Sequence, residues 1–248
     1  MAILILPDIH ARRFWKHAVG QEFNNVDKII FLGDYLDPYP WEGFTRMDAI
    51  INFEEILDFA SKNKDKVVLL LGNHDIPYIY KRDFNTRFRY DSSRAMKIGE
   101  LFKSHLNLFK LTHEEIINDK QYLFTHSGLH YEWYKNHKDL IGELTADNLN
   151  RLIKITPGRK ALCERSWYRG GNYTYPSFVW GDLYEFQEEI QEGKKINENI
   201  PWDYQIFGHT QLKDKPVIKE DFACLDCRKA FILTDENEII EIKEPEET

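Results

Sequence analysis

The sequence predicts an α/β fold organised around a parallel β-sheet. Short apolar runs recur along the chain, segments with helical spacing separate the first three of them, and polar residues follow each run. Strands that are buried on both faces read as continuous apolar runs, because both faces of a parallel sheet are covered. The predicted strands are AILIL (2–6), KIIFL (28–32), KVVLLL (66–71), QYLF (121–124) and YQIF (204–207).

The segments between these strands complete the α/β pattern. Residues 11–23 and 46–63 carry apolar side chains at helical intervals, so the chain begins as strand, helix, strand, helix, strand. Residues 92–109 predict a further helix, and residues 111–128 predict a β-hairpin. Residues 130–176 read as helical and aromatic, and the C-terminal third returns to strands.

The length and composition indicate one large globular domain. The chain has 248 residues, of which 42% are hydrophobic and 30% are charged, so a core of ordinary size can be buried. The sequence contains no repeat and no low-complexity linker. We therefore predict a single domain over residues 1–248, with helical or loop inserts near 76–110 and 130–176.

The charge and the cysteine content argue against several classes of protein. A net charge of −8 disfavours wide contact with a nucleic-acid backbone. No stretch approaches the roughly eighteen apolar residues of a membrane span, and the first apolar run is too short for a signal peptide. Three cysteines do not make a disulfide framework, so we expect a cytoplasmic protein in which Cys224 and Cys227 are structural residues between two strands.

Each predicted strand is followed by side chains that can bind metals. Open α/β sheets bind ligands at the carboxyl ends of their strands, so these side chains are expected to converge. A single buried histidine is more often a hydrogen-bonded core residue, but the polar residues of GNHD (72–75) have no packing reason to follow a buried strand. Gly72 would permit a tight turn there. The side chains are Asp8, His10, Asp34, Asp37, Asn73, His74, Asp75, His126 and His209.

The donor types in this set favour a pair of divalent ions. Carboxylate, imidazole and amide oxygen together suit borderline ions such as Mn²⁺, Fe²⁺ or Zn²⁺. No cysteine lies in the set, so a closed structural zinc site is not expected. Two ions that share a bridging carboxylate, about 3.5–4 Å apart, form a clamp for displacement at phosphorus.

The ordered motifs DIH, GDYLD, GNHD, THSG and GHT resemble those of the calcineurin-like metallophosphoesterase superfamily. The resemblance spans positions 8–210 and leans toward the branch of phosphoprotein phosphatases and diadenosine tetraphosphatases. The segment FVWGDL (178–183) also looks like a Trp-containing segment of that branch. The resemblance implies a four-layer α/β fold with a central β-sandwich flanked by helices. It also implies two divalent transition metal ions, manganese first, with iron or zinc as alternatives.

The resemblance further implies a role for each motif residue. A hydroxide between the two metals attacks phosphorus, the residue matching His74 protonates the leaving oxygen, and the residue matching Asp37 orients His74. The implied ligands are Asp8, His10 and Asp34 for the first metal, and Asp34, Asn73, His126 and His209 for the second, so that Asp34 bridges.

Three positions depart from the pattern of the family. Gln211 stands where many members have a second metal-binding histidine, Pro38 where the branch has a phosphate-binding arginine, and Ala11 where it has glycine. Another cation must then bind phosphate, and arginine does so with bidentate geometry. The candidate phosphate ligands are Arg12, Arg87, Arg89 and Arg169.

The expected function is therefore a metal-dependent phosphatase acting on phosphomonoesters, either of a phosphoprotein or of a small phosphorylated substrate. One alternative is a dinucleoside polyphosphate hydrolase, in which an aromatic-rich insert stacks a nucleobase, although such residues equally suit a core. An alternative of another class is a non-catalytic scaffold on the same fold, which would bind no metal and turn over no substrate. The aromatic residues are Trp133, Tyr134, Trp167, Tyr168, Tyr173 and Tyr175.

Overall fold

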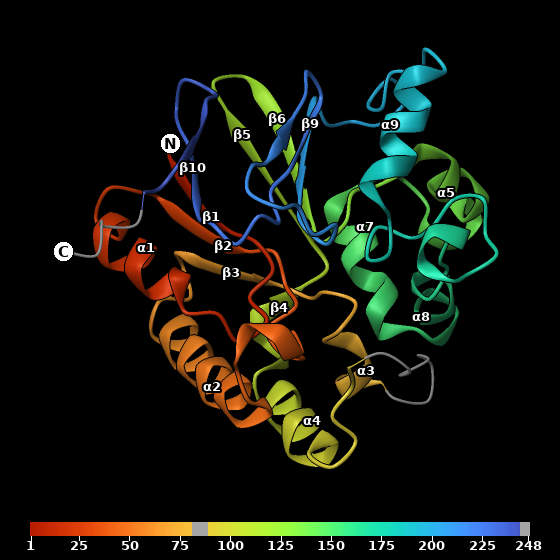
Figure 1. The fold of residues 1–248 in the computed structure, drawn as a ribbon. Coiled ribbons are helices and arrows are strands. Elements are labelled where there is room, and N and C mark those ends of the chain that lie inside the picture. The colour runs from red at the N-terminus through yellow and green to blue at the C-terminus, as the bar shows by residue number, and fades with distance from the viewer. Residues whose placement is uncertain (81–88, 244–248) are drawn as a thin grey trace.

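The computed structural model describes residues 1–80 and 89–243, and two β-sheets form its centre. Figure 1 shows the sheets side by side, with helices on their outer sides. Both sheets combine parallel and antiparallel strands, and the parallel strands of each sheet bring their carboxyl ends to one edge.

The first sheet contains the early strands that the sequence predicts. Its order is β11-β10-β1-β2-β3-β4, and β1 to β4 run parallel while β10 pairs antiparallel with β1. Parallel neighbours need long crossover connections, which the intervening helices provide. The strands are β1 Ile3–Leu6, β2 Lys28–Phe31, β3 Val67–Leu70, β4 Phe109–Lys110, β10 Phe231–Leu233 and β11 Ile239–Glu241.

The second sheet contains the predicted hairpin and the strand that precedes His209. Its order is β5-β6-β7-β9-β8, with β5 and β6 antiparallel and β6, β7 and β9 parallel. The carboxyl ends of β6 and β7 therefore lie at one edge. The strands are β5 Thr112–Ile117, β6 Lys120–Thr125, β7 Tyr204–Phe207, β8 Val217–Ile218 and β9 Phe222–Cys224.

Alternate residues of the strands pack into different layers, as the period of two requires. Between the sheets, Ile5 and Ile30 from the first sheet share a buried cluster with Phe124 and Ile206 from the second. The outer face of the first sheet packs against α1 (Phe14–Glu22), α2 (Arg46–Lys62) and α4 (Ala95–Ser104), and the outer face of the second packs against α9 (Leu183–Gln191). The result is a β-sandwich flanked by helices, so this predicted fold class is confirmed.

The helices begin and end where local chemistry favours it. In α2, the Thr45 hydroxyl accepts the N–H of Asp48, and the Asp48 carboxylate accepts the N–H of Thr45, which satisfies two free donors of the first turn. The helices are α1 Phe14–Glu22, α2 Arg46–Lys62, α3 Ile76–Ile79, α4 Ala95–Ser104, α5 Tyr131–Asn136, α6 Lys138–Ile141, α7 Ala146–Arg151, α8 Thr156–Leu162 and α9 Leu183–Gln191.

One element differs in detail from the sequence prediction. The helix predicted over 92–109 ends at Ser104, and the chain continues as a short 3₁₀ turn and then β4, whose Phe109 pairs with Leu69. The expected strand, turn and strand around Cys227 are present as β9 and β10, which belong to different sheets. Cys224 and Cys227 are buried and do not form a disulfide with each other, and no described helix is both long and apolar enough to cross a membrane.

Candidate metal centre and active site

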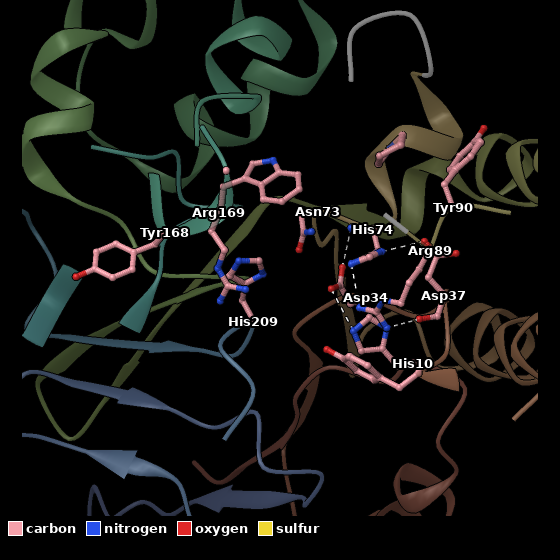
Figure 2. Close-up of a pocket in the computed structure, with 14 residues that line it drawn as sticks. His10, Asp34, Asp37, Asn73, His74, Arg89, Tyr90, Tyr168, Arg169 and His209 are labelled. Carbon is pink, nitrogen blue, oxygen red and sulfur yellow. Dashed lines mark hydrogen bonds and ion pairs between the residues drawn. The ribbon is translucent and has the colours of Figure 1, made fainter. Parts of the chain in front are cut away.

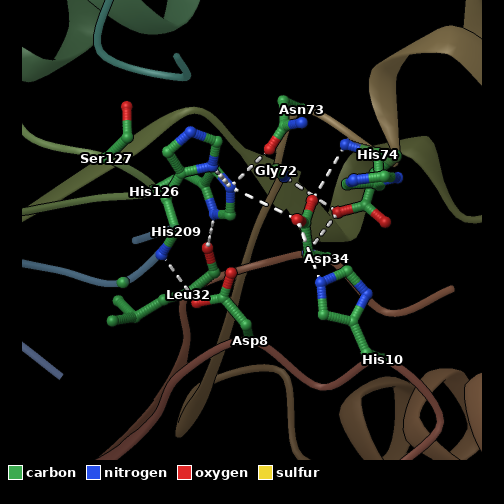
Figure 3. A network of polar contacts seen from close by, with 12 residues as sticks. Asp8, His10, Leu32, Asp34, Gly72, Asn73, His74, His126, Ser127 and His209 are labelled. Carbon is green, nitrogen blue, oxygen red and sulfur yellow. Dashed lines mark hydrogen bonds and ion pairs between the residues drawn. The ribbon is translucent and has the colours of Figure 1, made fainter. Parts of the chain in front are cut away.

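The loops that follow five strands bring the predicted metal ligands together. Asp8, Asp34 and Asn73 follow β1, β2 and β3 of the first sheet, and His126 and His209 follow β6 and β7 of the second. Figure 3 shows these side chains facing one another across the gap between the two sets of loops. The site therefore depends on how the two sheets pack.

The backbone at four residues of the site is held in a left-handed conformation. The φ angles are 41° at His10, 53° at Asp34, 56° at Asp37 and 66° at His209. Side chains other than glycine rarely adopt such angles, and each costs about 1–3 kcal/mol unless the surroundings fix it. Their concentration in these loops is typical of a functional site.

Glycines let two of the loops approach the carboxylates closely. A Cβ on Gly72 would lie 2.1 Å from Asp34 Oδ1, and a Cβ on Gly208 would lie 2.1 Å from Asp8 Oδ2. Residues 72–75 form the expected turn, in which the Gly72 carbonyl accepts the N–H of Asp75 at 3.2 Å, although Gly72 itself does not adopt a left-handed φ. The position requires glycine because no side chain fits beside Asp34.

Asp8, His10 and Asp34 form the first ligand cluster, with donor atoms within 4.8 Å of one another. His10 Nδ1 donates to the carbonyl of Leu36 at 2.7 Å, so its Nε2 presents a lone pair, 3.5 Å from Asp34 Oδ2. Asp8 Oδ2 accepts the N–H of His209, whereas buried Oδ1 has no hydrogen-bond partner among the described residues. A cation bound between these atoms would satisfy both.

Asp34, His126 and His209 form the second cluster. His126 Nδ1 donates to the carbonyl of Leu32 at 2.8 Å, which leaves the lone pair on Nε2. That lone pair lies 2.9 Å from Asn73 Oδ1 and 3.1 Å from His209 Nδ1. An acceptor nitrogen facing a carbonyl oxygen at this distance is stabilised by a cation between them.

The protonation of these groups also suits metal binding. Burial lowers the pKa of His10 and His209 well below the ordinary value, so both rings are neutral near pH 7. Burial alone would raise the pKa of Asp34, but the His126 and His74 rings hold it below the ordinary value. Neutral imidazoles and an ionised carboxylate are the forms that bind divalent ions, so the residues fit two ions that share Asp34.

His74 and Asp37 form a hydrogen-bonded pair beside the clusters. His74 Nδ1 lies 2.9 Å from Asp37 Oδ2, and the Tyr78 hydroxyl donates to Asp37 Oδ1 at 2.5 Å. Burial, followed by the Asp37 charge, raises the pKa of Tyr78 far above its ordinary value, so Tyr78 remains a donor. The pair places an oriented imidazole at the pocket, and Tyr78 is a supporting residue that the sequence analysis did not identify.

Asp75 belongs to neither metal-ligand cluster, but it shapes the site through hydrogen bonds to the backbone. Its carboxylate accepts the backbone N–H groups of Gly72, Asp34 and Tyr35 at 2.7–3.0 Å. Because these N–H groups belong to the loops after β2 and β3, Asp75 joins the two loops. The third polar residue of the GNHD motif is therefore explained by backbone hydrogen bonding.

Two of the four candidate arginines line the pocket of about 350 Å³ that opens over the clusters. Figure 2 shows Arg169 beside His209 and Arg89 beside His74. Arg169 Nε pairs with Asp182 at 2.7 Å. Arg12 does not line this pocket, because it is buried and Glu42 binds it through two hydrogen bonds. Arg87 lies outside the described residues.

Aromatic side chains form much of the remaining pocket wall. Of the six aromatic residues considered above, Tyr168 lines this pocket, whereas Trp133 and Tyr134 are buried in the core. Three further aromatic residues line the pocket, and the sequence analysis points to one of them, Trp180, through the resemblance of FVWGDL. The further aromatic lining residues are Tyr39, Tyr90 and Trp180.

Comparison with known proteins agrees with this geometry. Residues 1–212 match the family described as calcineurin-like phosphoesterase. A search of curated protein sequences found no match. The chain is similar in fold to the cold-active protein-tyrosine phosphatase of a psychrophilic Shewanella species, with a TM-score of 0.58, 15% identity, and coverage of 97% of this chain and 77% of that one.

A second similar structure comes from Saccharomyces cerevisiae. It is a protein serine/threonine phosphatase similar to human phosphatase PP5, with a TM-score of 0.51, 13% identity, and coverage of 99% of this chain and 82% of that one. These likenesses concern the fold, and the matched residues 1–212 include every ligand in both clusters. The chain belongs to the calcineurin-like phosphoesterase family.

Proposed function

We propose that this protein is a phosphatase that hydrolyses phosphomonoesters with two divalent transition metal ions, manganese first, with iron or zinc as alternatives. Asp8, His10 and Asp34 would hold one ion, and Asp34, Asn73, His126 and His209 the other. When bound, such ions polarise a phosphoryl group and lower the pKa of water.

The observation that carries the proposal is the His74–Asp37 pair at the mouth of two acceptor-rich clusters. Asp37 fixes the orientation of His74 through a 2.9 Å contact, and the other ring nitrogen, Nε2, faces Arg89 in the same pocket. A positioned imidazole can protonate an oxygen that leaves phosphorus, because histidine is a common general acid in enzymes.

Arg89 and Arg169 would bind the phosphate oxygens. They enter the pocket from different parts of the chain and lie beside His74 and His209 respectively. Two guanidinium groups and two ions favour a dianionic monoester over a singly charged diester. The tyrosine and serine/threonine phosphatases of similar fold add support for a phosphoprotein substrate.

A comparison of para-nitrophenyl phosphate with bis(para-nitrophenyl) phosphate tests the proposal. We expect Mn²⁺-loaded protein to hydrolyse the monoester faster than the diester, and chelation to abolish both activities. The opposite preference would identify a diesterase and contradict the proposal. Protein that binds no metal and hydrolyses neither ester would identify a scaffold.

A dinucleoside polyphosphate hydrolase remains a second candidate because aromatic residues line the pocket. Tyr39, Tyr90, Tyr168 and Trp180 could stack on a nucleobase. Arg89 covers one face of Tyr39 at 3.8 Å from the ring centroid, and Tyr90 stacks on Tyr78 at 4.5 Å, which reduces the free aromatic surface. Faster turnover of diadenosine tetraphosphate than of phosphopeptides would favour this candidate.

A further inference from the structure

Asp226 is a buried carboxylate that the proposed two-metal site does not explain. It lies in the loop between β9 and β10 and is 1% exposed. Neither of its carboxylate oxygens has a hydrogen-bond partner among the described residues. Buried carboxylates are normally hydrogen-bonded, because removing one from water without compensation is costly. Asp226 therefore requires hydrogen-bond donors that are not among the described residues.

The two arginines that act electrostatically on Asp226 do not supply those donors. Arg12 directs Nε and Nη2 to Glu42 and Nη1 to the Asp8 carbonyl. Arg228 directs Nε to Glu42 as well, and its Nη1 to the carbonyl of Lys213. Both arginines lower the pKa of Asp226 from a distance, but Glu42 takes their best-placed N–H groups.

Asp226 lies on the side of the site that holds Asp8. Its carbonyl accepts the N–H of Leu212 at 2.7 Å, just after the His209 loop, and Gly208 in that loop abuts Asp8 Oδ2. Burial raises the pKa of Asp226 well above its ordinary value, and Asp8 is the charged group that acts on it most strongly. The carboxylate is thus within electrostatic reach of the first cluster.

Gln211 adds an unsatisfied donor to the same place. Its amide Nε2 is buried and has no hydrogen-bond partner among the described residues. Gln211 precedes Leu212, whose N–H binds Asp226, and it occupies the position where many family members carry a metal-binding histidine. One side of the site therefore contains a free donor and two free acceptors.

The first ion would have three protein ligands, Asp8, His10 and Asp34, whereas manganese in oxygen-rich sites prefers about six. Water completes such a shell, and water bound to a cation is a strong donor that needs acceptors. We propose that Asp226 accepts hydrogen bonds from the water ligands of the ion at this site, and that the Gln211 amide joins the same network. Asp226 is then a positioning residue for the first ion, an inference that rests on the proposed function.

Calorimetric titration of metal-free protein with Mn²⁺ tests the role of Asp226. Loss of an outer partner typically weakens metal binding about 10–100-fold, so Asp226→Asn should lower the affinity of one of the two sites by that factor and leave the other unchanged. Asp214→Asn makes the same charge change at an exposed position in a nearby loop and should alter neither affinity. Two wild-type affinities in Asp226→Asn would overturn the inference.

Thermal unfolding in EDTA separates this role from a purely structural one. Asparagine has a similar volume and removes a buried charge, so metal-free Asp226→Asn should melt no lower than wild type, and Mn²⁺ should raise its melting temperature less. A lower metal-free melting temperature with the full Mn²⁺ increment would contradict the inference. If the variant does not fold, Gln211→Leu decides, because it should weaken the same site and unchanged affinity would overturn the proposal.

The outcomes also separate this inference from the proposed function. Wild-type protein that hydrolyses monoesters while Asp226→Asn binds both ions normally contradicts the inference alone. Wild-type protein that binds two ions but hydrolyses no ester contradicts the proposed function alone, because the affinity comparison still reports on Asp226.

Discussion

His74 contacts different partners through its two ring nitrogens. Nδ1 faces the Asp37 carboxylate, and Nε2 lies 3.1 Å from Arg89 Nη2. A guanidinium can only donate, so Nε2 accepts and the ring proton is on Nδ1. To protonate a leaving group through Nε2, His74 must first lose the contact between Nε2 and Arg89 and then bind a proton at Nε2. A phosphate that draws Arg89 away would permit this exchange, which links substrate binding to the acid.

His74→Asn should separate metal binding from chemistry. Asparagine cannot act as an acid, and loss of general acid catalysis typically costs about 10²–10⁴-fold in rate. The kcat for a phosphoserine peptide should fall most, because its alkoxide is strongly basic, whereas para-nitrophenolate leaves readily without a proton. Metal analysis together with kcat for both substrates provides the measurement.

The His74 prediction has a clear contrary result. A metal ligand would lose metal on substitution and depress both substrates alike. Loss of metal, or equal rate losses for the two substrates with chemistry rate-limiting, would show that His74 is not the acid. His105→Asn, a substitution in the short connection after α4, provides a control for replacing a histidine.

Arg169→Ala should raise KM for para-nitrophenyl phosphate. Arg169 is held by Asp182 and donates to the Thr210 hydroxyl at 3.0 Å, so its position in the pocket is fixed before phosphate binds. A hydrogen bond to a charged group is worth about 1.5–3 kcal/mol, which corresponds to roughly 10–100-fold in kcat/KM. Arg13→Ala, at an exposed position before α1, is the control, and equal kinetics for the two variants would remove Arg169 from the phosphate site.

At the scale of the elements, the loop after β3 requires glycine at position 72, because no side chain fits there. Gly72→Ala would place a Cβ 2.1 Å from Asp34 Oδ1, so the loop or the carboxylate must move. We expect weaker binding of both ions and a lower free energy of unfolding, measured by Mn²⁺ titration and urea denaturation. Gly20→Ala in α1 meets no atom within 4 Å and should instead stabilise by about 0.5–1 kcal/mol. Unchanged metal affinity in Gly72→Ala would contradict this account.

His130 connects the start of α5 to α9. Its ring is buried between Glu185, at 3.5 Å, and Glu189, at 3.4 Å. Burial lowers the pKa of His130, but the two carboxylates outweigh it and raise the pKa above the ordinary value. A pKa that is raised on folding stabilises the folded state fully below the unfolded pKa, and the stabilisation is lost as pH rises through the folded value.

The stability of metal-free protein should therefore decrease as pH rises above about 6.5, the ordinary histidine pKa. His130→Gln should remove part of that decrease, because glutamine cannot hold the charge between the carboxylates. Urea denaturation in EDTA across this pH range provides the measurement, with His105→Gln as the control. An identical pH dependence in wild type and His130→Gln would contradict the assignment.

At the scale of the elements, local sequence predicts much of the fold but not its pairings. Continuous apolar runs identify β1, β2 and β3, and polar residues after them identify the ligands, because both signals lie within a few residues. Arg12 is bound by Glu42, thirty positions away in the sequence, and therefore does not line the pocket. Similarly, β9 and β10 are close in sequence but join different sheets. Such contacts are set by tertiary packing, which a single sequence does not display.

At the scale of the whole molecule, the site is shared between the two sheets. Asp8 and Asn73 come from loops of the first sheet, and His126 and His209 from loops of the second, while Asp34 belongs to both ligand clusters. The sequence motifs predict the ligand set, whereas the contact of Tyr78 with Asp37 and the position of Asp226 beside the His209 loop are set by tertiary packing. Metal binding should accordingly stabilise the packing of one sheet on the other.

Removal of metal should therefore lower the stability of the whole fold. A ligand that binds only the folded state contributes about 2.7 kcal/mol at 100 times its Kd. Because Asp34 belongs to both clusters, Asp34→Asn should lose most of the stabilisation that Mn²⁺ gives the wild-type protein. Asp58→Asn makes the same substitution at an exposed site on α2, where the carboxylate pairs with Lys62, and should retain the full stabilisation. Urea denaturation of each protein with EDTA and with Mn²⁺ gives the difference directly. A full Mn²⁺ stabilisation in Asp34→Asn would show that the two clusters do not share this carboxylate.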